Sequence, residues 1–204
     1  VLDQEPTVST TATKASVAGT YDVNATGGSD DDYHFVYHGS SLEIGEAAQH
    51  LDSFEVASDA TYGDEPLPLD ATATSGLSVS FSSSNPEVVE VNGTRLNVRG
   101  AGTATITAHQ PGDANFFGAA DLNATVTVAT ADLQVIAHPA SKAYLDENPE
   151  LSFHYEGFVN GEDASVLDQE PTVSTTATKA SVAGTYDVNA TGGSDDDYHF
   201  VYHG

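Results

Sequence analysis

The stretch VLDQEPTVST occupies residues 1–10 and returns unchanged at residues 166–175. The identity extends further, because residues 1–39 and residues 166–204 are the same letter for letter. The two copies are offset by 165 residues (166 − 1), so the chain is one repeating unit followed by the first 39 residues of the next. A repeat of fixed length predicts an array of similar modules.

Acidic residues dominate the charge, with 31 Asp and Glu against 5 Lys and Arg and a formal net charge of −26. Such a surface repels nucleic acid and anionic membranes and attracts cations. Salt or divalent ions relieve its self-repulsion, so we expect a saline or calcium-rich exterior. The sequence has no Cys, which excludes disulfides and thiol chemistry, and no apolar run of about 18 residues that would span a membrane.

Apolar and polar residues alternate with a period of two, which predicts strands. The alternation is clearest in residues 20–25, 77–82, 103–108, 122–128 and 151–155. Asn92-Gly93 separates two apolar runs and predicts a two-residue hairpin turn. Helix signals are confined to residues 160–167, where one or two turns are expected with Asn160 as the cap. We therefore predict an all-β fold of small modules.

The repeating unit divides into two modules, residues 48–130 and residues 131–204. Residues 1–47 correspond to the C-terminal half of another module of the second kind, with residues 40–45 as its last strand. Half a module exposes apolar faces and unpaired edges, so something must supply strands equivalent to residues 133–158. The source is either the preceding stretch of a longer array, which we prefer, or another molecule that donates strands.

Two stretches of the second module carry a family resemblance: AYLDENPELSFHYEGFVNGEDASVL (143–167) and PTVSTTATKASVAGTYDVNATGGSDDDYHF (171–200). They resemble the MBG-type repeats of bacterial surface proteins. Two stretches of the first module, TYGDEPLPLDATATSGLSVSFSSSNPEVVEV (61–91) and VRGAGTATITAHQPGDANF (98–116), resemble YGX-type and bacterial Ig-like repeats. The resemblance implies tandem β-sandwich or Ig-like and MBG-like modules, the latter with a β-grasp-like alternative and one short helix, in a linear array of the kind found in giant adhesins.

The starts of the two modules also resemble each other, since ATYGDEPL at residues 60–67 parallels KAYLDENP at residues 142–149. The second of these stretches departs from the family pattern at Leu145, where the family usually has Gly. A turn is expected at both places.

Each copy of the repeated segment carries three adjacent carboxylates after a glycine pair: Asp30, Asp31, Asp32 and Asp195, Asp196, Asp197. Carboxylate oxygens are the hard ligands that calcium prefers. Neighbouring strand residues point to opposite faces, so only a turn would bring three carboxylates together. The runs are either solvated acidic loops, which is the interpretation we favour, or calcium sites.

Four N-x-[ST] sequons lie at Asn24, Asn92, Asn123 and Asn189, three on outward strand faces and one in the expected hairpin. His34 and His38 are expected on one face of a strand, opposite Tyr33, Phe35 and Tyr37, as surface or cross-strand residues.

The sequence contains no G-x-S-x-G, H-E-x-x-H or phosphate-cradling motif, so an enzyme is not expected. We expect a structural segment of a secreted or cell-surface stalk or fibre, in an adhesin or filament, that gives length, stiffness and display. The alternative is a carbohydrate- or mucin-binding adhesin module, with Tyr33, Tyr37, Tyr198 and Tyr202 as aromatic candidates. The third alternative is an accessory domain of a secreted hydrolase. The expected partners are neighbouring copies of the protein itself and surface glycans.

Overall fold

The computed structural model describes residues 2–204, which are built almost entirely from short strands joined by turns. Within that range the one helical element is a 3₁₀ turn, η1 (Ala164–Val166). The all-β fold predicted from the period of two is therefore confirmed. The chain forms two compact units: unit 1 contains Val1–Ser53, Ala71–Val79 and His109–Asp121, and unit 2 contains Phe54–Asp70, Ser80–Ala108 and Leu122–Gly204. The module boundaries predicted at 47/48 and 130/131 stay predictions.

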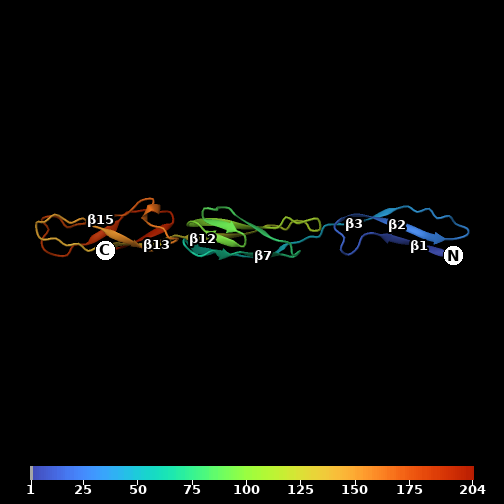
Figure 1. Cartoon of the computed structure of the whole chain (residues 1–204), viewed down its shortest axis with the longest axis horizontal. Coiled ribbons are helices and arrows are strands. Elements are labelled where there is room, and N and C mark those ends of the chain that lie inside the picture. Colours follow the sequence, from blue (N-terminus) through green and yellow to red (C-terminus); the bar gives the residue numbers. More distant parts are fainter. Residues whose placement is uncertain (1) are drawn as a thin grey trace. The chain divides into compact units, whose positions relative to one another are not determined.

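Unit 1 contains an antiparallel three-stranded sheet, drawn in blue in Figure 1, with β2 in the middle. Its strands are β1 (Gln4–Thr10), β2 (Gly19–Ser29) and β3 (Ser40–Ile44). The pairing places Thr7 opposite Thr26, and Tyr21 opposite Leu42. No residue from 2 to 50 is buried, so this sheet has strand pairing without a closed core.

The remaining segments of unit 1 are joined to this part of the chain by backbone contacts. Ala47 and Phe116 form a parallel bridge, and the Asn115 side chain accepts a hydrogen bond from the Ala18 N–H at 2.9 Å. A two-stranded sheet pairs β4 (Leu51–Glu55) with β7 (Asp70–Ala73). Leu51 is the first buried residue along the described chain.

The first half of unit 2 is formed by two sheets. One has the order β5-β12-β11-β8, from β5 (Asp59–Thr61), β12 (Leu122–Ala129), β11 (Gly102–His109) and β8 (Ser80–Ser83). The other has the order β6-β10-β9, from β6 (Leu67–Pro68), β10 (Arg95–Val98) and β9 (Val89–Asn92). The predicted hairpin is confirmed: Asn92 pairs with Arg95, and Gly93 in the turn has a φ of 62°.

The second half of unit 2 has β13 at its centre. Strand β13 (Ala131–Ala137) pairs antiparallel with β14 (Phe153–Glu156) and parallel with β17 (Tyr198–His203). A separate hairpin joins β15 (Thr172–Thr175) to β16 (Val188–Thr191). Figure 1 shows β13 and β15 in the orange part of the chain.

One apolar cluster runs through both halves of unit 2. Its fully buried side chains include Leu96, Ile106, Val126 and Leu133, each with no exposed surface. Along β11 the buried residues alternate with threonines, as expected when one face of a strand packs on a core. Burial of apolar surface at about 25 cal/mol per Å² is the main stabilising contribution in such a cluster.

Two local expectations need correction. The short helix is capped by Asp163, whose side chain accepts from Ser165 N, and not by Asn160, which has a φ of 55° in the preceding turn. A carboxylate two residues before a free backbone N–H is a better cap than an amide held in a left-handed turn. The strand predicted at residues 77–82 begins at Ser80.

The expected turn at Leu145 is present, and it matches the turn at Gly63. Leu145 has a φ of 70° and Gly63 a φ of 93°. In each turn the next residue, Asp146 or Asp64, donates its N–H to a carbonyl three residues earlier. Leu145 therefore takes a left-handed conformation that suits glycine, and its turn keeps the same hydrogen bond as the turn at Gly63.

The strand expected at residues 33–38 is absent, so that prediction is wrong for the first copy of the repeat. The same sequence forms β17 in the second copy, where β13 lies beside it. A strand needs a neighbour to satisfy its backbone N–H and C=O groups, and residues 33–38 have no such neighbour among the described residues.

Candidate functional site: the Glu162 junction

Glu162 lies between two tyrosines from distant parts of unit 2. Tyr62 follows β5, Tyr198 opens β17, and Glu162 lies in the turn between β14 and η1. The Tyr62 hydroxyl donates to one carboxylate oxygen of Glu162 at 2.7 Å, and the Tyr198 hydroxyl donates to the other at 2.6 Å. Hydrogen bonds to a carboxylate are stronger than neutral ones, so this residue joins the two halves of unit 2.

The tyrosine rings belong to the core as well as to the junction. Tyr62 is 7% exposed and Tyr198 is 3% exposed. Their rings meet edge to face with centroids 5.5 Å apart, and Phe158 meets Tyr198 at 5.3 Å. The Val159 N–H donates to the Tyr198 hydroxyl oxygen at 3.0 Å. Aromatic pairs of this geometry add about 0.5–1.5 kcal/mol beyond area burial.

Burial controls the protonation of both phenols. Burial, together with the hydrogen bond to Glu162, raises the pKa of Tyr62 to about 12. Burial also raises the pKa of Tyr198, again helped by Glu162. Both hydroxyls therefore stay protonated at neutral pH and remain hydrogen-bond donors.

Asp197 makes a second contact between the two halves of unit 2. Its carboxylate accepts from the Ala101 N–H at 2.6 Å, and its carbonyl accepts from the Ala131 N–H at 2.9 Å. A Cβ added to Gly100 would lie 3.0 Å from the Asp197 carboxylate, so glycine permits the close approach. Burial raises the pKa of Asp197, while the Ala101 N–H acts in the opposite direction.

The turn at Gly63 packs tightly against Val159. A Cβ added to Gly63 would lie 2.6 Å from the Val159 Cβ, which no side chain at this position can accommodate without movement. The Tyr62 N–H donates to the Ala129 carbonyl at 2.9 Å, which fixes the turn to the end of β12. The turn, the carboxylate and the tyrosines together stabilise one geometry and present no group poised for covalent chemistry.

In each of the two acidic runs, the first carboxylate accepts hydrogen bonds from backbone N–H groups and so stabilises a turn. The Asp195 carboxylate accepts from the N–H groups of Asp197 and Tyr198 at 2.8 and 3.0 Å. In the first copy the Asp30 carboxylate accepts from the Asp32 N–H at 2.9 Å. Across residues 2–204 no group of three or more His, Asp or Glu side chains is arranged to hold a metal ion. Calcium binding at Asp30, Asp31, Asp32, Asp195, Asp196 and Asp197 stays a prediction.

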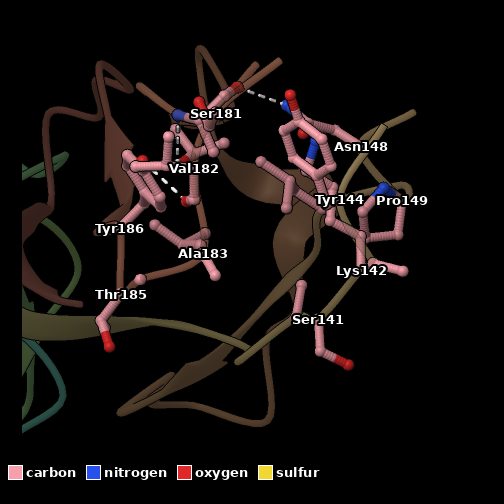
Figure 2. A pocket seen from close by; sticks show the side chains of 17 residues that line it. Ser141, Lys142, Tyr144, Asn148, Pro149, Ser181, Val182, Ala183, Thr185 and Tyr186 are labelled. Carbon is pink, nitrogen blue, oxygen red and sulfur yellow. Dashed lines mark hydrogen bonds between the residues drawn. The ribbon is translucent and has the colours of Figure 1, made fainter. Parts of the chain in front are cut away.

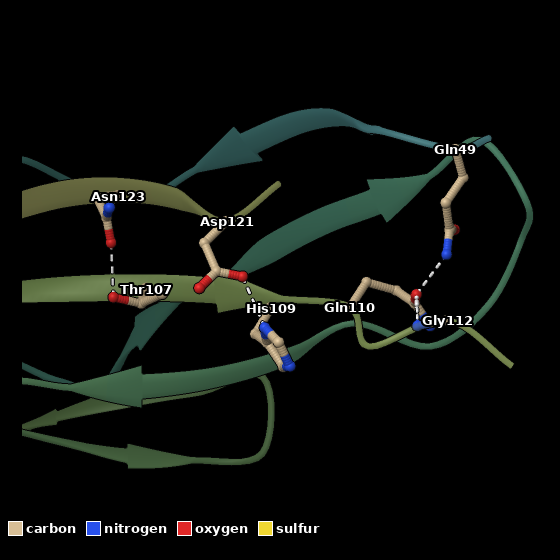
Figure 3. Close-up of polar contacts among 7 residues, drawn as sticks. All are labelled: Gln49, Thr107, His109, Gln110, Gly112, Asp121 and Asn123. Carbon is tan, nitrogen blue, oxygen red and sulfur yellow. Dashed lines mark hydrogen bonds and ion pairs between the residues drawn. The ribbon is translucent and has the colours of Figure 1, made fainter. Parts of the chain in front are cut away.

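The four sequon asparagines are all exposed, in the positions expected from the sequence. Asn24 lies on β2, Asn189 on β16, and Asn92 ends β9 before the hairpin turn. On β12 the Asn123 side-chain oxygen accepts from the Thr107 hydroxyl at 2.6 Å, as Figure 3 shows. That contact uses the side-chain oxygen and does not involve the side-chain nitrogen, the atom that would carry a glycan.

Unit 1 has a polar centre of its own at Gln110, which is 3% exposed. Its side-chain oxygen accepts from Gln49 Nε2 and from the Gly112 N–H, both at 2.6 Å (Figure 3). A Cβ added to Gly112 would lie 2.3 Å from the Phe116 carbonyl oxygen, so the loop requires glycine there. The buried amide is satisfied, and its role is to hold the 109–121 segment in shape.

Three histidines, His109, His138 and His154, make contacts with side chains of neighbouring segments. His138 and His154 stack with ring centroids 4.9 Å apart and a 2.9 Å contact between ring nitrogens. His109 lies 2.6 Å from the Asp121 carboxylate (Figure 3).

An open hollow of about 350 Å³ lies at the 140–151 and 175–188 segments of unit 2 (Figure 2). Tyr144, which is 62% exposed, Asn148 and Tyr186 are among its lining residues. The Asn148 amide donates to the Ala177 carbonyl at 2.6 Å, so the hollow is bounded by ordered turns. Its volume lies at the lower end of the range for small-molecule sites.

Sequence reasoning missed Glu162 and Tyr62 as junction residues. Both appear in turn sequences, GED and TYGD, that look solvated because acidic residues are abundant throughout the chain. The available signal was Tyr198: it begins an alternating strand directly after three carboxylates, and a buried tyrosine at that point needs a partner for its hydroxyl.

Residues 133–204 match the family described as MBG domain (YGX type). The MBG resemblance carried by residues 143–200 is thereby confirmed for this part of the chain, while the YGX-type and Ig-like resemblance of residues 48–130 stays a prediction. MBG domains are non-catalytic repeat-type domains found in surface adhesin-like proteins. No match was found among curated proteins or among solved structures. No helix in the described chain has the length and apolar character needed to cross a membrane.

Proposed function

We propose that the chain is a structural repeat segment of an extracellular stalk or fibre, whose role is length, stiffness and display. The observation that carries the proposal is the Glu162 junction, where one carboxylate binds Tyr62 and Tyr198 from the two halves of unit 2. A contact in which both carboxylate oxygens accept hydrogen bonds from buried tyrosines stabilises one arrangement, as a stiff repeat requires. The match of residues 133–204 to a repeat-type domain of surface proteins supports the same function.

The proposal includes the absence of an enzymatic role and an extracellular or cell-surface location. The 165-residue period supports it, because an array that repeats its sequence multiplies length and does not concentrate one active site. The partners in this proposal are neighbouring copies of the same modules.

Electron microscopy of the native assembly, with and without EDTA, tests the proposal. Ordered filaments with an axial repeat that matches two modules are the expected result. Loss of that order in EDTA would assign calcium to the acidic runs, whereas filaments indifferent to EDTA would make these runs solvated turns. Separate flexible strings or single particles under both conditions would contradict a structural fibre.

A second candidate function, a carbohydrate-binding adhesin module, is favoured by the hollow in Figure 2. The exposed ring of Tyr144 can stack on a sugar face, and Asn148 lines the same hollow. A glycan array with the parent chain and a Tyr144→Ala variant tests this function. Binding by the parent that the variant loses would support the carbohydrate-binding function. Absence of binding by the parent would contradict it.

The four exposed sequons are the basis for a further proposal, that the native protein carries N-linked glycans. Intact-protein and peptide mass spectrometry of native material measures occupancy at Asn24, Asn92, Asn123 and Asn189. Unmodified asparagines at all four positions would contradict the proposal.

A further inference from the structure

The second copy of the repeated segment is completed by strands that precede it. In β17 the residues Tyr198 to His203 pair in parallel register with β13, so that Phe200 lies opposite Leu133. Tyr198 is 3% exposed, and Leu133 has no exposed surface. Residues 198–203 therefore obtain their backbone partner from β13, while Tyr198 also packs on Tyr62 and donates to Glu162.

The first copy has the same sequence and lacks these contacts. Tyr33 is 70% exposed and Val36 is 72% exposed, although their counterparts Tyr198 and Val201 are buried or half-buried. Large apolar side chains grouped in this way on one short segment mark an interaction surface.

The hairpin of the first copy is already folded as in the second. Thr7 pairs with Thr26 in the first copy, just as Thr172 pairs with Thr191 in the second. The difference at residues 33–38 therefore reflects the missing neighbour, because the sequence and the hairpin are the same in both copies.

We propose that residues 2–39 are the acceptor half of a second MBG-type module, and that their occupant is a further segment with the sequence of residues 131–165, placed ahead of them in the same polypeptide. Residues 33–38 then form a strand parallel to the β13 equivalent of that segment. Phe35 takes the position of Phe200, opposite the donor's leucine, and Tyr33 enters the core as Tyr198 does.

Two separate chains that exchange their β13–β14 hairpins do not complete an additional module. A chain that lends its β13–β14 hairpin to a neighbour exposes its own residues 198–203, so one completed module is lost for each one gained. A donor within the same polypeptide adds a module without that loss, and its effective concentration reaches the millimolar range or higher. This inference is independent of the proposed function, because a glycan-binding module needs the same core.

The opposite edge of the module gives an independent observation of the same kind. In the first copy, β3 pairs with β2 from Gly19 to Val23. The equivalent residues 184–187 of the second copy lie outside any strand, and Gly184, Thr185 and Tyr186 line the hollow in Figure 2. The complete module therefore consists of residues 131–204 and a strand like Ser40–Ile44 that pairs with residues 184–188 beside the hollow.

The test extends the full chain with a copy of residues 131–165 ahead of Val1. Because residues 1–39 and 166–204 are identical, ¹⁵N is confined to residues 1–47 by segmental ligation, and amide exchange is read by NMR. The expected result is at least a tenfold slowing of exchange at residues 33–38, to the rate of residues 198–203 measured on a chain labelled in that part. Unchanged exchange in the extended chain would overturn the proposal.

Two controls separate the alternatives. The extended chain with Leu133→Asp in the added copy only is expected to leave residues 33–38 unprotected, and protection there would show that pairing with the donor strand is not the cause. The unextended chain is expected to stay monomeric by sedimentation, with residues 33–38 unprotected at all concentrations. Protection that grows with concentration would overturn the choice of a donor within the same polypeptide.

A second extension carries residues 40–47 after Gly204. It is expected to slow amide exchange at residues 184–188 to the rate of residues 19–23 in the same protein. Unchanged exchange at residues 184–188 would contradict the edge-strand part of the proposal. Neither extension bears on whether the native protein forms filaments, so the failure of this inference and the failure of the proposed function are distinguishable.

Discussion

Residues 2–39 and residues 167–204 have the same sequence and different structures. Both form the same hairpin. In both, a tyrosine hydroxyl donates a hydrogen bond to the carbonyl four residues earlier, Tyr21 to Val17 and Tyr186 to Val182. They differ most at the end, where one copy has an exposed unpaired segment and the other a paired strand that begins at buried Tyr198. The comparison separates what a sequence does alone from what a neighbouring strand adds.

The substitution with the largest expected effect removes a side chain from the core that only the second copy has. Leu133→Ala should lower the free energy of unfolding of the 131–204 region by about 2–5 kcal/mol, because the side chain is fully buried and leaves a cavity. Amide exchange of β13, read by NMR, measures the change. Val8→Ala, at a residue 69% exposed in the first copy, is the control and should change stability by less than about 0.5 kcal/mol. Equal losses of stability from the two substitutions would contradict the difference in core packing between the copies.

The next prediction uses one tyrosine from each copy. Tyr198→Phe should cost about 1–3 kcal/mol, because it leaves a Glu162 oxygen and the Val159 N–H without their shared partner in a buried site. Tyr33→Phe, the same change in the same local sequence, should cost less than about 0.5 kcal/mol because its ring is exposed. Denaturant unfolding of the two variants, with exchange at β17 as a local probe, gives the comparison. A cost at Tyr33 as large as at Tyr198 would show that the first copy has a core.

The pH dependence of stability provides a third comparison. Burial raises the pKa of Asp197, so the folded state binds its proton more tightly than the unfolded state. Its contribution to stability is therefore fully present below the unfolded pKa of about 3.9 and is lost as pH rises through the raised folded value.

Asp197→Asn removes this titration, so the stability of the parent relative to that variant should fall as pH rises across the acidic range. Unfolding free energies of both proteins at a series of pH values measure the slope. Asp32→Asn removes the same charge from the same sequence context and is the matched control. A relative stability of the parent that rises with pH would contradict the direction.

The smallest expected effect concerns an exposed ion pair. Lys179 Nζ lies 2.6 Å from the Glu147 carboxylate, with side chains 57% and 77% exposed. Lys179→Ala should cost about 0.2–1 kcal/mol at low salt and less at high salt, because water and ions screen such pairs. Lys14→Ala, at the exposed counterpart in the first copy, is the control. Thermal unfolding at two salt concentrations checks the prediction, and a cost that does not change with salt would point to packing of the lysine stem.

Much of the fold follows from short-range patterns. The alternation in residues 103–108 and 122–128 predicts β11 and β12, and Asn92-Gly93 predicts the hairpin between β9 and β10. These elements could be recognised because side-chain alternation and turn chemistry act within a few residues.

The candidate site was predicted less well. The acidic runs were recognised, but the partner of Asp197 is the backbone of Ala101, nearly one hundred positions away. Glu162 likewise meets Tyr62 across 100 residues. Contacts of that separation leave no local pattern, because they are created when two folded parts pack together.

The sequence by itself determined the local structure of this protein, and the repeat shows this directly. Pro6 packs against Gly28 as Pro171 packs against Gly193, and the Asp30 turn is the Asp195 turn. Such contacts lie within one 39-residue stretch, so equal sequences give equal structures. The tertiary structure alone decided whether residues 33–38 or 198–203 become a strand. A strand obtains its hydrogen bonds and its burial from a neighbour, and only the second copy has β13 beside it.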